Sequence, residues 1–196
     1  MSKSELRKIY LERRQLLSPD ETAEKSQRIA DLFFQSFDLE PIKILHCFIA
    51  IEKFKEIDTT LIFRRLWKDF PHVETLVPRV NFETGEIENL KFAPGTALVR
   101  NIWEIHEPSH DEYVETQKID AVLVPLLCFD AAGHRVGYGK GFYDKFLSKC
   151  RPDCTKIGLS YFPPVEAIAA TGGHDIMLDI CVTPEKTYQF DKEKGG

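Results

Sequence analysis

Hydrophobic side chains recur with helical spacing in the first part of the chain. Within residues 3–17 they fall near one helical face, at Leu6, Ile9, Tyr10, Leu16 and Leu17. A second helix is expected to begin at Ser18, because Ser18 can cap it, Pro19 suits its first turn and Glu21 completes a capping box.

Continuous apolar runs, rather than alternating ones, separate the predicted helices. They predict strands over residues 42–50, 73–78, 119–125, 156–160 and 179–183. We also expect helices after residues 58–59 and over residues 143–150, a hairpin over residues 81–92 and an irregular segment over residues 97–111. Strands buried on both faces indicate an α/β fold, a three-layer sandwich with a mostly parallel sheet. The length of 196 residues favours one domain over residues 1–190, followed by a polar tail at residues 191–196.

Composition excludes several classes of protein. The net charge is −5, and 43% of the residues are hydrophobic. This balance is typical of a globular protein and disfavours a general nucleic-acid binder. The longest apolar run, residues 121–129, is far shorter than the ~20 residues of a membrane span. Five scattered cysteines, and an N-terminus without an apolar core, favour a reducing cytoplasm. We therefore expect a cytoplasmic protein that binds neither nucleic acid nor membrane. Small-molecule partners and a monomer rather than an oligomer are our further expectations.

A glycine-rich segment follows the predicted strand at residues 119–125. Its alternating Gly137, Gly139 and Gly141 suit a loop whose main-chain N–H groups approach a phosphate. Arg135 and Lys140 add positive charge, and the later carboxylate of Asp144 could hold Mg²⁺. The spacing matches neither a Walker A loop nor a dinucleotide fingerprint. The segment predicts a polyphosphate site, with a tight structural turn as the alternative.

In the order of its motifs the chain resembles the 5-formyltetrahydrofolate cyclo-ligase family. The most specific match is VPLLCFDAAGHRVGYGKGFYD at residues 124–144. Other matches are KSELR at residues 3–7, EIDT at 56–59, VPRV at 77–80, WEIHEP at 103–108 and HD at 174–175. The chain departs from the family at Leu126, which is usually glycine, and at Val136, which is usually leucine. Neither departure removes a polar functional group.

The resemblance implies a fold like that of ribose-5-phosphate isomerase and the CoA transferases. It also implies an ATP- and Mg²⁺-dependent conversion of 5-formyltetrahydrofolate into 5,10-methenyltetrahydrofolate, ADP and phosphate. The γ-phosphoryl group would activate the formyl oxygen, and N10 would then attack the formyl carbon. In such a reaction the protein mainly positions groups and neutralises charge.

The same resemblance assigns roles to individual residues. For the nucleotide it implies Lys3, Ser4, Glu5, Leu6 and Arg7, together with Arg135, Val136, Gly137, Tyr138, Gly139, Lys140, Gly141, Phe142 and Tyr143. For the folate it implies Ile51, Glu56, Trp103, Tyr138, Gly139, Lys140, Gly141 and Phe142. The expected catalytic residues are Lys140, Arg135 and Tyr143. The expected Mg²⁺ ligands are Asp144 and Asp175, with Asp179 as a rival for the second position.

Simpler interpretations stand beside these roles. Lys3 and Arg7 would also suit a solvated helix face, and Trp103 would suit a core position. Arg79 follows a strand and could reach the site or form a surface ion pair. Two other functions stay open, a sugar-phosphate isomerase on the same type of fold and a non-catalytic binder of nucleotide or folate.

Overall fold

An eight-stranded sheet runs through the computed structural model, which describes residues 1–101, 105–169, 172 and 175–190. Its strand order is β12-β11-β10-β7-β1-β2-β3-β6. The strands are β1 Ile44–Cys47, β2 Glu74–Asn81, β3 Glu86–Lys91, β6 Tyr113–Val114, β7 Ala121–Pro125, β10 Thr155–Leu159, β11 Ile180–Val182 and β12 Thr187–Gln189. Strands β11, β10, β7, β1 and β2 are mutually parallel, whereas β12, β3 and β6 pair antiparallel at the two sides. The prediction of a mostly parallel sheet is confirmed.

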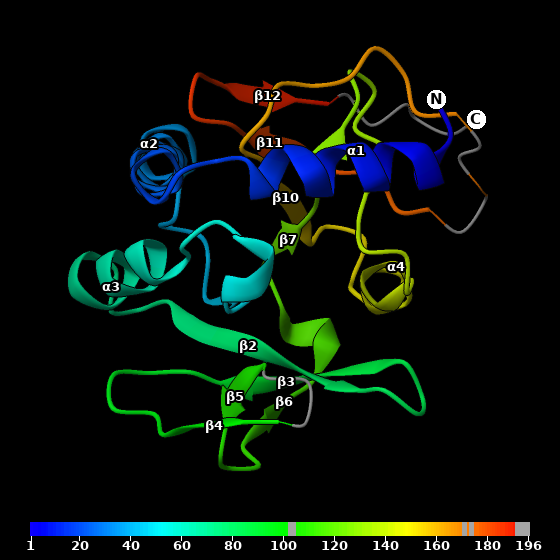
Figure 1. Ribbon diagram of the computed structural model, residues 1–196. Coiled ribbons are helices and arrows are strands. Elements are labelled where there is room, and N and C mark those ends of the chain that lie inside the picture. The colour runs from blue at the N-terminus through cyan, green and yellow to red at the C-terminus, as the bar shows by residue number, and fades with distance from the viewer. Residues whose placement is uncertain (102–104, 170–171, 173–174, 191–196) are drawn as a thin grey trace.

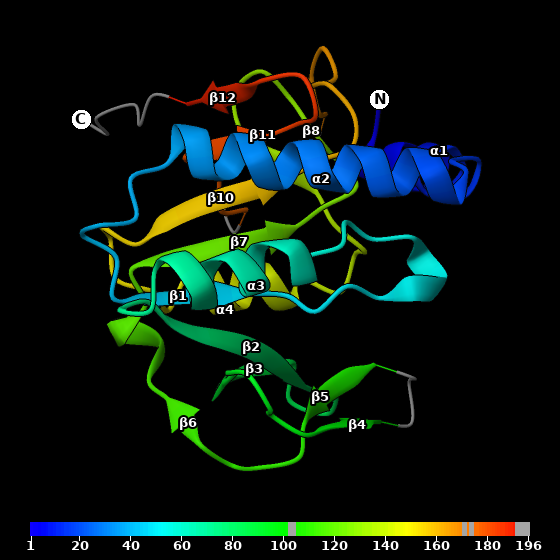
Figure 2. The same cartoon turned by 90° about the vertical axis from the view of Figure 1, so that its left-hand side faces the viewer.

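Helices cover both faces of this sheet. The helices are α1 Lys3–Gln15, α2 Pro19–Ser36, α3 Thr60–Asp69 and α4 Phe142–Leu147, with short 3-10 helices η1 Glu52–Phe54 and η2 Thr116–Lys118. Helices α2 and α3 lie on one face and α4 lies on the other (Figure 1). Figure 2 shows α1 beyond the ends toward which the arrows of β7 and β10 point. Helix α1 therefore lies at the carboxyl edge of the parallel strands, where α/β proteins place their ligands.

The continuous apolar runs have a direct structural explanation. Neighbouring residues of a strand point to opposite faces, and here both faces are covered. Val122 and Val124 of β7 pack in the cluster that includes Phe146 of α4. Leu123, between them, packs in the cluster that includes Ile29 of α2. All of these side chains are buried, so the strand shows no polar alternation.

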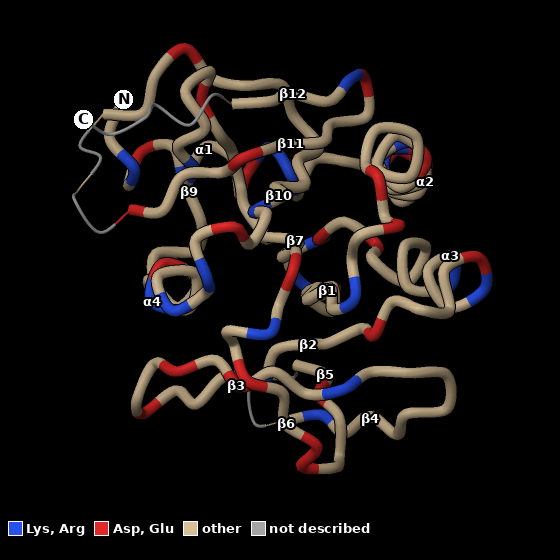
Figure 3. Tube along the Cα trace, turned by 180° about the vertical axis from the view of Figure 1, so that it is seen from behind, with Lys and Arg blue, Asp and Glu red and all other residues tan. Residues whose placement is uncertain are grey.

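Two capping boxes set the beginnings of the first two helices. In α2 the Glu21 N–H donates to Ser18 Oγ at 3.1 Å, and the Ser18 N–H donates to Glu21 Oε2 at 2.8 Å, as predicted. Helix α1 begins with the same arrangement of Ser2 and Glu5, which the sequence analysis did not identify. None of the helices described here is long and apolar enough to cross a membrane. Figure 3 shows Lys and Arg intermixed with Asp and Glu along the described trace.

Several details differ from the predictions. Helix α1 ends at Gln15, and Leu16, expected on its apolar face, is 84% exposed because the chain reverses there toward Ser18. The first strand stops at Cys47, since the chain leaves the sheet toward η1. Strand β12 was not predicted, because its three residues are too short to show a pattern. Two small hairpins also appear, β4 Leu98–Arg100 with β5 His106–Pro108, and β8 Cys128–Phe129 with β9 Arg135–Val136.

Within the segment expected to be irregular, Arg79 of β2 binds the described residues 108–111. Its Nη2 donates to the carbonyl oxygens of Pro108 and His110, each at 2.8 Å, and its Nη1 lies 2.6 Å from Asp111 Oδ1. The ion-pair interpretation of Arg79 therefore agrees with its contacts. This arginine attaches the β4–β5 hairpin to the main sheet.

The packing around Gly158 of β10 gives a test of the fold. A Cβ atom there would lie 2.6 Å from Leu178 Cδ1 and 2.7 Å from Leu126 Cδ2. Because both leucines are buried, Gly158→Ala should lower the free energy of unfolding by about 1–3 kcal/mol. Urea unfolding measures the change. The matched control is Gly137→Ala, whose Cβ would meet nothing within 4 Å and should change stability by no more than ~0.5 kcal/mol. Equal unfolding midpoints for the two variants would contradict this packing.

Candidate active site

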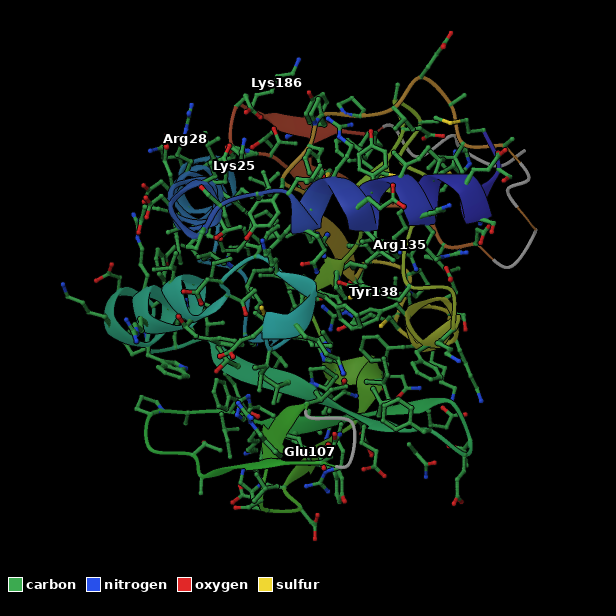
Figure 4. The ribbon with its side chains drawn as sticks, in the orientation of Figure 1. Lys25, Arg28, Glu107, Arg135, Tyr138 and Lys186 are labelled. Atoms are coloured by element: carbon green, nitrogen blue, oxygen red, sulfur yellow. The ribbon has the colours of Figure 1, made fainter. Side chains whose placement is uncertain are left out.

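The glycine-rich loop between β9 and α4 passes beneath α1. Arg7 Nε donates to the Gly137 carbonyl oxygen at 2.9 Å. Gly139 has a φ of 91°, and a Cβ there would lie 3.0 Å from Arg7 Cζ. The backbone conformation thus favours glycine at position 139, and any larger residue would also displace the end of the Arg7 side chain. Gly141, with a φ of 71°, then leads into α4. Figure 4 shows Arg135 and Tyr138 below α1, near the middle of the molecule.

Two ion pairs gather predicted residues from three parts of the chain. Arg135 is nearly buried, and its Nη2 lies 2.7 Å from Asp144 Oδ1. Asp144 Oδ1 also accepts the Ile176 N–H at 3.2 Å. Lys3, on α1, forms an ion pair with Asp175. The first helix, the start of α4 and residues 175–176 therefore meet around these four charged side chains.

The electrostatics of this cluster favour an ionised Asp175 carboxylate. Burial would raise the pKa of Asp175, but hydrogen bonds from Lys3 and from the Gly172 N–H bring this pKa below its usual value. Burial lowers the pKa of Arg135, against the opposing effect of Asp144 and then of Asp175. Both carboxylates thus act on the same guanidinium. Asp179, the rival for the second metal position, instead lies 3.3 Å from Lys156 Nζ and accepts the Lys156 N–H.

The donor set suits Mg²⁺ shared with a phosphate. Mg²⁺ is usually held by one or two protein carboxylates together with phosphate oxygens and water, rather than by a cage of protein ligands. Asp144 and Asp175, which both act on the Arg135 guanidinium, could supply the two carboxylates. Within the described residues no three His, Cys, Asp or Glu side chains gather to hold a metal ion. Lys140 is exposed and forms no ion pair or hydrogen bond with a described residue, so its ammonium group is open to an anion.

A second network, also under α1, contains a residue that the sequence analysis missed. Arg14 is 2% exposed, and its Nη1 donates to the Tyr138 hydroxyl at 2.8 Å. That hydroxyl donates to Glu56 Oε1 at 2.5 Å, while the Ile51 N–H donates to Glu56 Oε2 at 2.8 Å. Arg14 follows Leu6 and Tyr10 at intervals of four residues, on the buried face of α1. This spacing could have identified Arg14 from the sequence, since a buried arginine is rare unless it has a paired partner.

Burial disfavours the ionised form of Glu56, and this network partly offsets that effect. Burial raises the pKa of Glu56 above its usual value, although the hydrogen bonds from Tyr138 and the Ile51 N–H and the charge of Arg14 each lower it. Burial, followed by the charge of Glu56, raises the pKa of Tyr138, so its hydroxyl keeps its proton. The result is a carboxylate with a fixed orientation beside the glycine loop.

Tyr143, predicted to be catalytic, points to a buried histidine. Its hydroxyl lies 3.5 Å from His46 Nε2, and His46 Nδ1 lies 2.9 Å from Asn89 Oδ1. Burial lowers the pKa of His46 to about 3, so the imidazole is neutral near pH 7. Because Asn89 Nδ2 is bonded to Val114 O and Thr116 Oγ1, its oxygen faces His46 and requires a proton on Nδ1. His46 Nε2 is then the acceptor for Tyr143.

The remaining predicted residues differ in what they offer a ligand. Leu6 and Val136 are buried in the core, which leaves only their main-chain atoms for binding. Glu5 caps α1, and its exposed neighbour Ser4 has no contact that defines a role. The Phe142 ring packs at 5.7 Å from that of Phe82. The predictions for Trp103 and for the histidine of the HD motif lie outside the described residues.

Comparison with known proteins identifies the family to which the chain is similar. A profile of the 5-formyltetrahydrofolate cyclo-ligase family matches residues 1–184. A protein of Escherichia coli K12 named 5-formyltetrahydrofolate cyclo-ligase is 28% identical over 183 residues, covering 91% of this chain and 98% of that protein. A mouse protein of the same name is 25% identical, covering 76% of this chain and 75% of its own length.

Solved structures extend the similarity to the fold. The structure of Aquifex aeolicus 5,10-methenyltetrahydrofolate synthetase superimposes with a TM-score of 0.82 at 28% identity, covering 100% of this chain and 96% of that one. The synthetase of Mycoplasma pneumoniae gives a TM-score of 0.75 at 26% identity, covering 94% and 99%. With the family profile matching nearly the whole chain, we conclude that this protein belongs to the 5-formyltetrahydrofolate cyclo-ligase family of enzymes.

Proposed function

We propose that the protein uses ATP and Mg²⁺ to cyclise 5-formyltetrahydrofolate to 5,10-methenyltetrahydrofolate. One observation carries the proposal: the glycine loop runs from the charged cluster to the Glu56 network and back. Arg135 of β9, just before the loop, pairs with Asp144 of α4, just after it, while Tyr138 within the loop bonds Glu56. A nucleotide bound at the charged cluster and a pterin bound at the Glu56 network would therefore meet along the backbone of this loop.

ATP solves a specific chemical problem in this reaction. A formamide carbonyl is a poor electrophile, and its oxygen is a poor leaving group. Transfer of the γ-phosphoryl group to the formyl oxygen releases ADP and turns that oxygen into a phosphate ester. N10 then attacks the formyl carbon and loses its proton, and the carbon–oxygen bond breaks to release phosphate. Positioning and charge neutralisation supply most of the catalysis in phosphoryl transfer.

The charged cluster provides groups for the nucleotide. Asp144 and Asp175 would hold Mg²⁺, which neutralises charge on the phosphate oxygens when it is bound. Lys3 and Arg135 are the present partners of these carboxylates, so they are already close to where phosphate oxygens would have to lie. Lys140 would neutralise the transferred group. Tyr143, through His46, would fix the start of the helix that carries Asp144.

The Glu56 network provides groups for the folate. An ionised carboxylate accepts hydrogen bonds and donates none, so Glu56 suits the amino and ring N–H donors of a pterin. Ile51 adds an apolar side chain at the same place, because its N–H is bonded to Glu56. Tyr138 and Arg14 would fix the carboxylate before the substrate arrives.

The direct test is turnover by the purified protein. Mixing it with MgATP and 5-formyltetrahydrofolate should produce the near-ultraviolet absorbance of methenyltetrahydrofolate, with one ADP formed for each product molecule. Omission of ATP should abolish the signal. Folded protein that binds both ligands without forming product would contradict the proposal and favour a non-catalytic binder.

Lys140→Met tests the residue assigned to the transferring phosphoryl group. Loss of a positive charge that acts mainly in the transition state should lower kcat by about 100-fold or more. The KM for folate should change by less than about threefold, because ground-state binding is retained. Lys8→Met, at an exposed lysine of α1, is the matched control and should leave kcat unchanged. A rise in KM with normal kcat would show that Lys140 serves binding alone.

Tyr138→Phe tests the ionisation of Glu56. Burial raises the pKa of Glu56, and the Tyr138 hydroxyl, the Ile51 N–H and the charge of Arg14 lower it. Removing the Tyr138 hydroxyl removes a hydrogen bond that lowers the pKa of Glu56, so this pKa should rise. Since the ionised form is the active one, the acidic limb of kcat/KM should move to higher pH.

The matched control for this prediction is Tyr10→Phe, because the Tyr10 ring packs on Phe162 and makes no contact with Glu56. Its pH profile should equal that of the unaltered protein. If the acidic limb of kcat/KM does not move in Tyr138→Phe, the ionisation of Glu56 does not set the pH dependence of the reaction.

A further inference from the structure

A pocket of about 90 Å³ opens beside the Glu56 network. Its lining residues are Ala50, Ile51, Glu52 and Lys53, which follow β1, and Arg100, Ile105 and His106 of the β4–β5 hairpin. Ile51 belongs both to this lining and to the network, because its N–H donates to Glu56. The pocket is therefore the immediate continuation of the proposed pterin site.

The lining combines apolar walls with positive charge. Ile51 and Ile105 are apolar, Lys53 and Arg100 are cationic, and Glu52 is the one carboxylate among the lining residues that the structure describes. The whole chain has a net charge of −5, so an anionic ligand depends on local cations of this kind. The composition suits a ligand with an apolar body and a carboxylate end.

Arg100 is oriented by its neighbour across the hairpin. Arg100 pairs with His106 in the β4–β5 register, and its Nε donates to His106 Nε2 at 3.1 Å. The two Nη atoms of Arg100 make no hydrogen bond or ion pair with any residue in the described ranges. A guanidinium held in this way presents planar N–H donors to a carboxylate, with which it forms short, charge-assisted hydrogen bonds.

Both walls of the pocket are attached to the rest of the protein. On one side, Gln15 of α1 donates to the Lys53 carbonyl oxygen at 2.9 Å. On the other side, the Ile105 N–H donates to Asn101 Oδ1 at 3.1 Å, and Arg79 bonds the Pro108 carbonyl oxygen. Glu107, labelled in Figure 4, accepts a hydrogen bond from Asn101 Nδ2. The described strands of the β4–β5 hairpin, which carry Arg100, are thus attached to the main sheet.

We infer that this pocket binds the glutamate carboxylates of the folate substrate, with Arg100 as the main contact. The inference rests on the proposed function. A folate carries hydrogen-bond donors on its pterin, an aryl ring in the middle and carboxylates at the far end. Glu56 suits the donors of the pterin and would repel the carboxylates. The two isoleucines suit the aryl ring, and Arg100 suits the carboxylates. One substrate can therefore span the two neighbouring sites in a single direction.

Arg100→Ala with two matched substrates tests the inference. One substrate is 5-formyltetrahydrofolate, and the other is 5-formyltetrahydropteroate, which lacks the glutamate. Arg100→Ala should raise KM for the first by about tenfold and leave KM for the second and for MgATP within about twofold. Arg100→Lys should recover part of the loss. Arg28→Ala, which removes an exposed charge from α2, is the control and should match the unaltered protein.

Two results would overturn the inference. Equal effects of Arg100→Ala on both folates would show that the arginine does not contact the glutamate. A raised KM for MgATP alone would assign the pocket to nucleotide phosphates. Should the unaltered protein turn over neither folate, the proposed function fails. Calorimetry without ATP then measures the affinity of the pocket for each of the two folates. The inference requires that Arg100→Ala weaken the binding of the glutamate-bearing folate only.

Discussion

The packing of α1 across the carboxyl edge of the sheet is the contact on which the candidate site depends. Arg7 bonds the backbone of the glycine loop, and Arg14 bonds Tyr138 within it. At the end of the helix, Lys55 Nζ donates to the carbonyl oxygens of Gln15 and Leu17, each at 2.7 Å. Helix α1 thus holds both the loop after β9 and the loop after β1. Without it, neither the charged cluster nor the Glu56 network would have a fixed geometry.

The sheet makes this arrangement possible because its buried strands stabilise the fold, while the loops at its edge carry the groups of the candidate site. Its strands are buried on both faces, and the apolar clusters under α2, α3 and α4 provide the rigid support. The loops that leave the carboxyl edge carry the polar groups. The antiparallel strands β2 and β3 extend the sheet to one side and carry the β4–β5 hairpin through Arg79. The proposed subsites for nucleotide, pterin and glutamate therefore lie on loops and hairpins fixed by one core.

Sequence reasoning predicted the parts that depend on local pattern. The capping box at Ser18 and the buried strand around Leu123 follow from short-range chemistry, and both were predicted correctly. The pairing of Lys3 with Asp175 was not predictable in this way, because 172 residues separate the two side chains along the chain. Arg14 was overlooked because the sequence does not show which distant side chains a charge on an apolar helix face will contact, and here the partner is Tyr138. The β4–β5 hairpin was missed because its strands are exposed or short and show no alternation.

In the proposed reaction the glycine loop brings the terminal phosphoryl group of ATP to the formyl oxygen of the folate. The most direct measurement uses 5-formyltetrahydrofolate labelled with oxygen-18 in the formyl group, followed by mass analysis of the phosphate released. Transfer to the formyl oxygen predicts that each phosphate carries one labelled oxygen. Product formation with unlabelled phosphate would contradict the claim, because ATP would then have been cleaved without activating that oxygen.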